Sequence, residues 1–145
     1  MPTSNSLIDD RVLIARLVRE RVRLPRDGLF TTSYWYYRAC RAAVVGGSGQ
    51  LSGPFAALAD DEQASAIRAM LSLPADIALA DPRLLVPEMV AMHQRHPQLD
   101  IMNLEALGAA SLLDARVLLS ERAADGALPG PLSAEGLAWR VIKIG

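Results

Sequence analysis

The chain alternates between short apolar runs and longer segments in which apolar residues recur every three or four positions. Short apolar runs bounded by turn residues are typical of buried strands, whereas the longer spacing is typical of amphipathic helices. The run at 116–120 is apolar after its first residue and ends in Ser120, which indicates a buried strand of a parallel sheet. Strands that alternate with helices predict an α/β fold, with right-handed crossovers that cover both faces of the sheet.

This pattern predicts a single domain over 1–145. The strands are 7–9, 29–31, 76–79, 116–120 and 139–144, and loops are expected at 46–49 and 126–133. The first predicted helix is 12–22, and the second is 34–45, with Thr32 or Ser33 as its cap. The third is capped by Asp60 or Asp61 and ends at Pro74, and its apolar face consists of Ala64, Ile67, Met70 and Leu71. The fourth is 82–96, with a kink or a restart at Pro87, and the fifth is capped by Asn103 and ends before Asp114.

The composition is that of a globular chain, with 51% hydrophobic residues and a positive mean hydropathy. A length of 145 residues is enough for one domain with a sizeable core. No apolar run approaches the roughly 20 residues of a membrane-spanning helix. The first residues also lack the basic flank and apolar run of a signal peptide. A single cysteine, Cys40, cannot form an internal disulfide. These features predict a cytoplasmic protein with no membrane contact.

The charged residues are distributed unevenly, although the formal net charge is only -1. Residues 1–41 carry eight arginines against four acidic residues, whereas acidic residues are in excess in the rest of the chain. Arginine can bind phosphate through two parallel hydrogen bonds, so this basic region is a candidate nucleic-acid surface. The candidate contacts are Arg16, Arg19 and Arg38. A solvated helix face in an arginine-rich protein is the alternative interpretation.

Two further groups of residues each allow a functional and a structural interpretation. The segment 34–37 holds Trp35 and all three tyrosines, which could stack on bases or pack in the core with their hydroxyls in water. We expect Trp35 and at least one of the tyrosines to be buried. His93 and His96 are close enough in sequence to share a zinc ion. No third ligand lies nearby, however, and an exposed helix end is favoured.

Asp9 and Asp10 lie where a predicted strand passes directly into a helix. In an open parallel sheet, ligands and catalytic groups collect at the carboxyl ends of the strands. A carboxylate at this edge has to be solvated, paired or bound to a metal ion, because burying it alone is very costly. This acidic pair is therefore the first candidate for chemistry in the chain.

The run 7–15 resembles the opening of PIN-domain nucleases, in which a short strand ends in an Asp that helps to bind a divalent metal ion. On this match Asp9 is the metal carboxylate and Asp10 occupies a variable small polar position. The resemblance covers nearly the whole chain in the order and spacing of its elements.

The region 99–125 resembles the same family. Glu105 lies at the start of a helix rich in small residues, and Ser120 ends the strand that follows. Asp125 lies in the next loop, with Glu121 as a nearby substitute. In the family these places hold an acid, a Ser or Thr, and a further Asp.

The resemblance implies a three-layer α/β/α sandwich with a short central parallel sheet, and a metal-dependent ribonuclease of the kind found as the toxin of toxin–antitoxin pairs. Asp9, Glu105 and Asp125 would hold Mg²⁺ or Mn²⁺, with Ser120 as a supporting polar group. The ion would activate a water molecule and stabilise charge on the scissile phosphate. RNA would be the substrate, and an antitoxin-like protein or a second copy of the chain would be the partner. We therefore expect the three carboxylates to meet at one edge of the sheet.

One position departs from the family pattern. The family usually carries another acid early in the helix after the second strand, and this place falls on Tyr37 or Arg38. If Arg38 points into the acidic cluster, its guanidinium could replace the charge of the metal by pairing with Asp9 or Glu105. The alternative function is then a PIN-like module that has lost cleavage and binds RNA or a protein partner.

A third interpretation is a flavodoxin-like or signalling domain in which Asp9 and Asp10 bind Mg²⁺. Such a domain is expected to have a phosphoacceptor Asp at the end of a central strand and a lysine late in the chain. Lys143 is the only lysine and lies at the extreme end of the sequence, so this interpretation is the least favoured.

Overall fold

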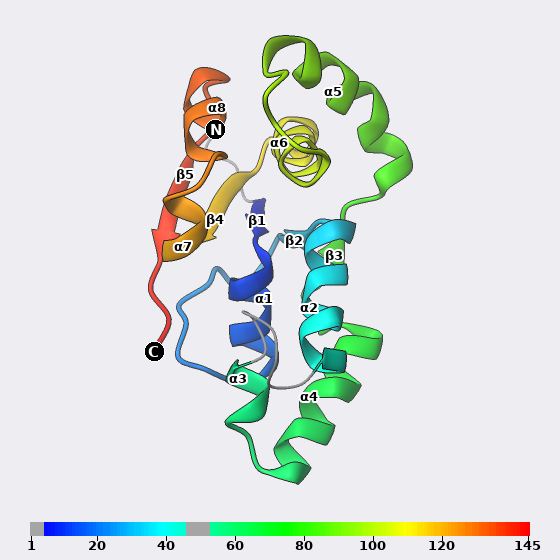
Figure 1. The fold of residues 1–145 in the computed structure, drawn as a ribbon, viewed down its shortest axis with the longest axis vertical. Helices are drawn as coiled ribbons and strands as arrows, with labels where there is room; N and C mark the ends of the chain where they lie inside the picture. Colours follow the sequence, from blue (N-terminus) through cyan, green and yellow to red (C-terminus); the bar gives the residue numbers. More distant parts are fainter. Residues whose placement is uncertain (1–4, 46–52) are drawn as a thin grey trace.

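The computed structural model describes residues 5–45 and 53–145, and within these ranges the strands form one parallel sheet (Figure 1). All four neighbouring strand pairs are parallel, in the order β3-β2-β1-β4-β5. The strands are β1 (Ser6–Ile8), β2 (Leu29–Thr31), β3 (Ile77–Leu79), β4 (Arg116–Ser120) and β5 (Trp139–Ile142). The predicted parallel α/β fold is confirmed, and each of the predicted strands is present.

Helices connect the strands, as parallel pairing requires. They are α1 (Asp10–Leu17), α2 (Ser33–Val45), α3 (Gly53–Ala56), α4 (Asp60–Ser72), α5 (Pro82–Arg95), α6 (Ile101–Leu113), α7 (Glu121–Ala124) and α8 (Pro129–Ala134). Among the described residues, no helix has both the length and the apolar character needed to cross a membrane.

Successive residues of a strand pack in two different cores, one on each face of the sheet. Leu7 packs in the core shared with α5, α6 and α8, whereas Ile8 packs in the core shared with α1 and α4. In β4, Val117 and Leu119 belong to the first core and Leu118 belongs to the second. Helices therefore cover both faces of the sheet, which confirms the predicted three-layer α/β/α arrangement (Figure 1).

The first helix is shorter than predicted, because α1 ends at Leu17 rather than at Val22. Arg19 adopts a left-handed conformation with φ of 62°. The amide of Glu20 donates a hydrogen bond of 2.8 Å to the carbonyl of Ala15, which closes the helix as in a Schellman motif. The predicted helix was too long because Val22 is apolar and packs on the core, but it does so from an extended segment rather than from a helix.

Two predicted helix starts are wrong for local reasons. The N-cap of α6 is Asp100 rather than Asn103, because the Asp100 side chain accepts a hydrogen bond of 2.9 Å from the Asn103 amide. The helix therefore begins three residues earlier than the Asn103 cap implied, at Ile101 rather than at Leu104. The N-cap position of α4 is Ala59. Asp60 and Asp61 lie in the first turn, where their negative charges stabilise the positive end of the helix dipole.

Three other predictions about helices need correction. The segment 126–133 contains α8, in which Pro129 takes the first helical position that suits proline. Helix α5 continues through Pro87, so of the predicted kink or restart only the restart is excluded. In α4 the buried residues are Ala66 and Met70, whereas Ala64, Ile67 and Leu71 of the predicted apolar face are exposed, because this helix contacts the core along a single narrow line. The predicted loop at 46–49 lies outside the described residues.

Helix α2 begins next to the centre of the sheet and is held there by two threonines. The Thr31 hydroxyl donates to the carbonyl of Ile8 at 2.9 Å, and the Thr32 hydroxyl accepts from the Trp35 amide at 3.1 Å. Thr32 is thus the N-cap, as predicted. Trp35 is 3% exposed. Tyr36 is half-buried, and its hydroxyl donates to a backbone carbonyl of α4, so the expected burial is confirmed.

We expect Thr32→Val to lower the free energy of unfolding by about 1 kcal/mol, because it removes the cap of α2 while keeping the volume of the buried side chain. Urea denaturation followed by far-ultraviolet circular dichroism measures the change. An unaltered midpoint would contradict the assignment of Thr32 as the cap.

Candidate functional site

The carboxyl ends of the central strands border a cavity of about 500 Å³. This position is the one expected for a binding site in an open parallel sheet. We call this space the edge cavity. Its polar and charged lining residues are Asp10, Arg11, Arg38, Asn103, Ser120, Glu121 and Arg122, and Trp35, Met102, Leu128, Ile142 and Ile144 are among its apolar ones.

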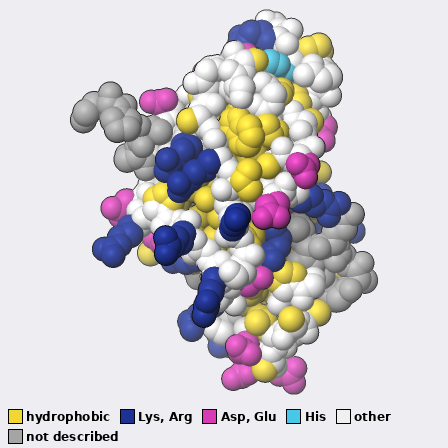
Figure 2. Space-filling view, turned by 90° about the vertical axis from the view of Figure 1, so that its left-hand side faces the viewer, with side chains coloured by type: hydrophobic (Ala, Val, Ile, Leu, Met, Phe, Trp, Pro, Cys, Tyr) yellow, Lys and Arg dark blue, Asp and Glu magenta, His cyan; other side chains and the backbone are white. Residues whose placement is uncertain are grey.

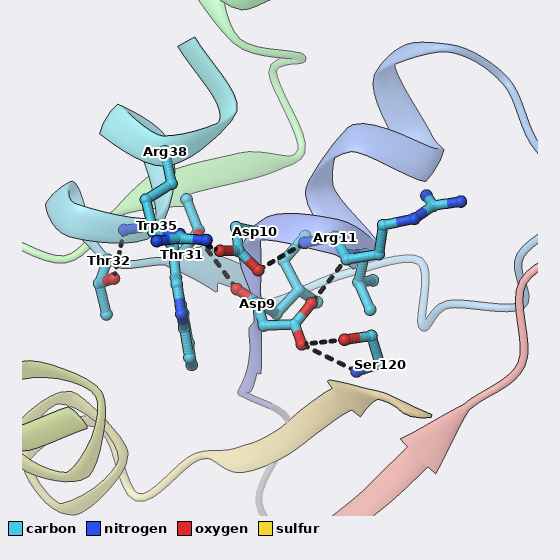
Figure 3. A network of polar contacts seen from close by, with 10 residues as sticks. Asp9, Asp10, Arg11, Thr31, Thr32, Trp35, Arg38 and Ser120 are labelled. Atoms are coloured by element: carbon cyan, nitrogen blue, oxygen red, sulfur yellow. Dashed lines mark hydrogen bonds and ion pairs between the residues drawn. The ribbon is translucent and has the colours of Figure 1, made fainter. Parts of the chain in front are cut away.

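Asp9 lies between β1 and α1 and is fully buried. One carboxylate oxygen accepts a hydrogen bond of 2.8 Å from the Val12 amide, so Asp9 is the N-cap of α1. The other oxygen accepts from the Ser120 amide at 2.8 Å and from the Ser120 hydroxyl at 2.7 Å (Figure 3). Asp9 therefore joins the start of α1 to the end of β4, and both of its oxygens are engaged by protein donors.

The pKa of the Asp9 carboxyl is raised from its ordinary 3.8 to about 6. Burial is the main cause, and the charge of Asp10 adds to it. The hydrogen bonds from Val12 and Ser120 act in the opposite direction by stabilising the carboxylate. Asp9 thus gains a proton under mildly acidic conditions.

Asp10, unlike Asp9, lines the edge cavity and has a cationic partner. The Arg38 Nε donates to an Asp10 carboxylate oxygen at 2.8 Å, and the second oxygen accepts from the Arg11 amide at 2.8 Å (Figure 3). Arg38 does enter the acidic region, as the alternative interpretation supposed, but its partner is Asp10 rather than Asp9 or Glu105. The reason is that Asp9 points back to cap its own helix, which leaves the next residue facing α2.

Two more arginines line the same cavity. Arg11 forms a two-point ion pair with Glu20, with distances of 2.7 and 3.1 Å. Arg122 lies two residues beyond the end of β4 and is exposed. Within the described residues it has no carboxylate partner, so its guanidinium is available to a ligand.

Glu105 is buried but does not line the edge cavity. Its carboxylate accepts hydrogen bonds from the Ser33 hydroxyl at 2.6 Å and from the Tyr34 amide at 2.9 Å. Glu105 thereby binds the positive end of α2 from α6. This contact is structural, since it fixes the start of the helix that carries Arg38.

The structure does not bring the predicted metal ligands together. Asp125 is the exposed C-cap of α7 and does not line the cavity. Across residues 5–45 and 53–145, no group of three or more His, Cys, Asp or Glu side chains is placed to hold a metal ion. Hydrogen bonds from protein donors to Asp9 and Glu105 do not by themselves prevent metal binding, since metal-bound carboxylates are usually hydrogen-bonded as well. The predicted arrangement does not fit Mg²⁺ or Mn²⁺ because Asp9, Glu105 and Asp125 form no such group, and Glu121, the substitute for Asp125, lines the edge cavity with Asp10 instead.

The other candidate residues lie outside the edge cavity, and two of them have structural partners. Arg16 forms a two-point ion pair with Asp76, and hydrogen bonds from Arg16 lower the pKa of that carboxyl. Arg19 is exposed and lies outside the cavity lining. The His96 Nε2 lies 2.7 Å from a Glu135 oxygen, so this histidine links the end of α5 to the end of α8.

Sequence reasoning missed Arg122, Asn103 and the Arg11–Glu20 pair as parts of the site. Arg122 had a usable signal, because it follows the end of a predicted central strand, where side chains reach the edge of the sheet. The Arg11–Glu20 pair had none, because it depends on the reversal of the chain at the end of α1.

No protein-family model matches this chain, and no curated protein is significantly similar to it. The function is therefore inferred from the site itself.

We expect Ser120→Ala to raise the pKa of Asp9 above 6, because the serine hydroxyl stabilises the carboxylate. The free energy of unfolding at neutral pH should fall by about 1–3 kcal/mol, the usual cost of losing a hydrogen bond to a buried charged group. Carboxyl ¹³C chemical shifts followed against pH report the pKa. Ser133→Ala, which removes an exposed hydrogen bond to Trp139, is the control and should change stability by less than about 0.5 kcal/mol.

Asp9 should also make stability depend on pH. The raised pKa means that the folded protein holds this proton more tightly than the unfolded chain does. The contribution of Asp9 to stability is therefore complete below pH 3.8 and falls as the pH rises to about 6, by about 3 kcal/mol in all. Asp9→Asn should remove this slope. Denaturation midpoints of both proteins between about pH 3.5 and 7 test the expectation, and parallel curves would contradict it.

Proposed function

We propose that this protein is a PIN-like module that binds RNA and in which an arginine–aspartate ion pair has replaced metal-dependent cleavage. The observation that carries the proposal is the contact of 2.8 Å between the Arg38 Nε and Asp10 at the mouth of the edge cavity. Arg38 thus supplies a cation to Asp10, the residue next to the carboxylate that the resemblance assigns to the metal ion.

The charge balance of the acidic pair supports this proposal. Adjacent carboxylates resist joint ionisation unless a metal ion, a proton or a cation lies close to them. Here Arg38 neutralises Asp10, while Asp9 is stabilised by three hydrogen bonds and has a pKa of about 6. Both carboxylates are therefore stabilised by protein groups, without a bound metal ion.

Several groups of the edge cavity suit an anionic ligand. Arg11 and Arg38 are paired with acids, whereas Arg122 has no carboxylate partner among the described residues and can bind phosphate. Asn103 adds an amide that can donate to phosphate, while the exposed Glu121 is the lining group that opposes an anion. Tyr37 precedes Arg38 in α2 and lies outside the cavity lining, but it is 61% exposed and offers a ring on which a base can stack. Guanidinium, amide and aromatic groups together suit a single-stranded RNA.

The experiment measures thermal melts with and without millimolar Mn²⁺, and the binding of a labelled single-stranded RNA in EDTA. The melting temperature of the wild type should not respond to Mn²⁺, and RNA should bind without metal. Arg122→Ala should weaken RNA binding about tenfold, equivalent to about 1.4 kcal/mol. A Mn²⁺-dependent rise in melting temperature together with cleavage of the RNA would overturn the proposal in favour of a metal-dependent ribonuclease.

Arg38→Gln tests the role of the ion pair directly. With Arg38 removed, the two lining carboxylates Asp10 and Glu121 no longer compete with that guanidinium for a cation, so the melting temperature of the variant should respond to Mn²⁺, whereas that of the wild type should not. The variant itself should lose only about 1 kcal/mol of stability, because the pair is partly exposed. Arg83→Gln breaks a surface pair with Asp81 and is the matched control, with no gain of Mn²⁺ response. Equal responses of the two variants to Mn²⁺ would count against a special role for Arg38.

A further inference from the structure

A second concave surface lies beside the edge cavity and has an unusual lining. It encloses about 410 Å³ and is lined by Arg21, Arg23, Arg140, Val141, Ile142, Lys143 and Gly145. Four of these residues are cationic, and the lining contains no acidic residue. We call this surface the basic groove.

The backbone explains why these cations face outward together. The segment that leaves α1 alternates between exposed Arg21 and Arg23 and half-buried Val22, as the two-residue period of an extended chain requires. Val22 forms an antiparallel bridge with Ile144, and the amide of Gly145 donates to the Arg21 carbonyl at 3.0 Å. This pairing places two arginines from early in the sequence beside the end of β5.

The four cations of the groove also lack acidic partners. Elsewhere in the described chain, five arginines have a carboxylate within 4 Å: Arg11, Arg16, Arg38, Arg83 and Arg95. Within the same described residues, no carboxylate comes this close to a cation of the groove. Like charges gathered without counter-charges raise the local positive potential and attract anions. Figure 2 shows Lys and Arg side chains gathered across the middle of this side of the molecule.

Protection of the sheet edge does not account for the whole groove. Charged side chains on an edge strand prevent pairing with other chains, which is a sufficient reason for Arg140 in β5. Arg21 and Arg23, however, lie in the segment after α1 and belong to no strand of the sheet. Their position beside Arg140 and Lys143 calls for a further reason.

The groove adjoins the edge cavity, since Ile142 lines both. The two hollows are therefore neighbours at the end of β5, and Arg122 lines the one that is not basic throughout. A concave basic track that leads to a cavity with hydrogen-bonding groups suits a flexible polyanion, as in folds that bind single strands. Stable attachment to a membrane usually combines basic residues with a large exposed apolar surface, whereas Val141 is the one large exposed apolar side chain in the lining of the groove.

We infer that the basic groove binds the phosphodiester backbone of single-stranded RNA and leads that strand to the edge cavity. This inference rests on the proposed function for the identity of the ligand. Arg21, Arg23, Arg140 and Lys143 each contact phosphate, whereas the edge cavity receives the nucleotide that follows along the strand.

The test is fluorescence anisotropy with a labelled oligouridylate of about twelve nucleotides, within the range that single-strand-binding folds cover. The double variants Arg21→Ala/Arg23→Ala and Arg140→Ala/Lys143→Ala each remove two charges from the groove. Arg41→Ala/Arg68→Ala removes two exposed charges from α2 and α4 and is the matched control for net charge. Circular dichroism melts verify that all three variants fold.

Each double variant of the groove should weaken binding by about tenfold or more at 0.1 M salt. The slope of log affinity against log salt should decrease by about 1.4, because each phosphate contact to a single strand contributes about 0.7. The control pair should leave this slope unchanged. Arg122→Ala should also weaken RNA binding, because it removes a cation of the edge cavity rather than one of the groove.

The outcomes separate this inference from the proposed function. If the wild type binds RNA, and the groove variants bind as the control does, the groove inference is wrong while RNA binding by the edge cavity stands. If the wild type fails to bind RNA, the proposed function and the inference are both overturned. Binding to vesicles that contain phosphatidylserine, lost in the groove variants and without RNA binding, would assign the groove to a membrane surface and also overturn the inference.

Discussion

The edge of the sheet depends on one buried carboxylate. Asp9 accepts hydrogen bonds from the first turn of α1 and from the end of β4, which lies 111 residues away in the sequence. A carboxylate in a buried position is stable only if such donors compensate for its lost hydration. The same contacts determine the direction of the next residue, so that Asp10 faces α2 and the edge cavity. The geometry of the candidate site therefore follows from the hydrogen bonds by which Asp9 caps α1.

The charge of the site follows from the same arrangement. Arg38 compensates Asp10 and Glu20 compensates Arg11, so two of the arginines of the edge cavity form neutral pairs. Among the described residues of the two hollows, the charges outside ion pairs are Arg122 and Glu121 in the cavity and the four cations of the basic groove, so cations are in excess. An acidic pair that suggests a metal site in the sequence thus lies beside a surface with excess positive charge. This reversal is the physical basis for proposing RNA as the ligand.

The sequence predicts the sheet well because strand signals are local. Short apolar runs and the Thr32 cap depend on neighbouring residues, and the structure confirms them. The roles of the acidic residues depend on distant partners, and the sequence alone does not reveal them. Glu105 binds Ser33 and Tyr34, more than 70 residues away, so its position near a helix start was predictable but its structural contact was not. The exposed face of α4 was missed for the same reason, since only tertiary packing selects which apolar residues are buried.

Asp9 and Glu105, which the sequence assigned to a metal ion, each hold the first turn of a helix instead. Asp9 caps α1, which carries Asp10, and Glu105 holds the start of α2, which carries Arg38. These two helices contact each other, so the ion pair at the cavity depends on both carboxylates. A carboxylate can accept these hydrogen bonds and still offer a free lone pair to a metal ion, so the contacts of Asp9 and Glu105 alone do not exclude one. The Arg38–Asp10 pair is the stronger obstacle, because a divalent ion at Asp10 would have to separate it, whereas an anionic ligand at Arg122 leaves it intact.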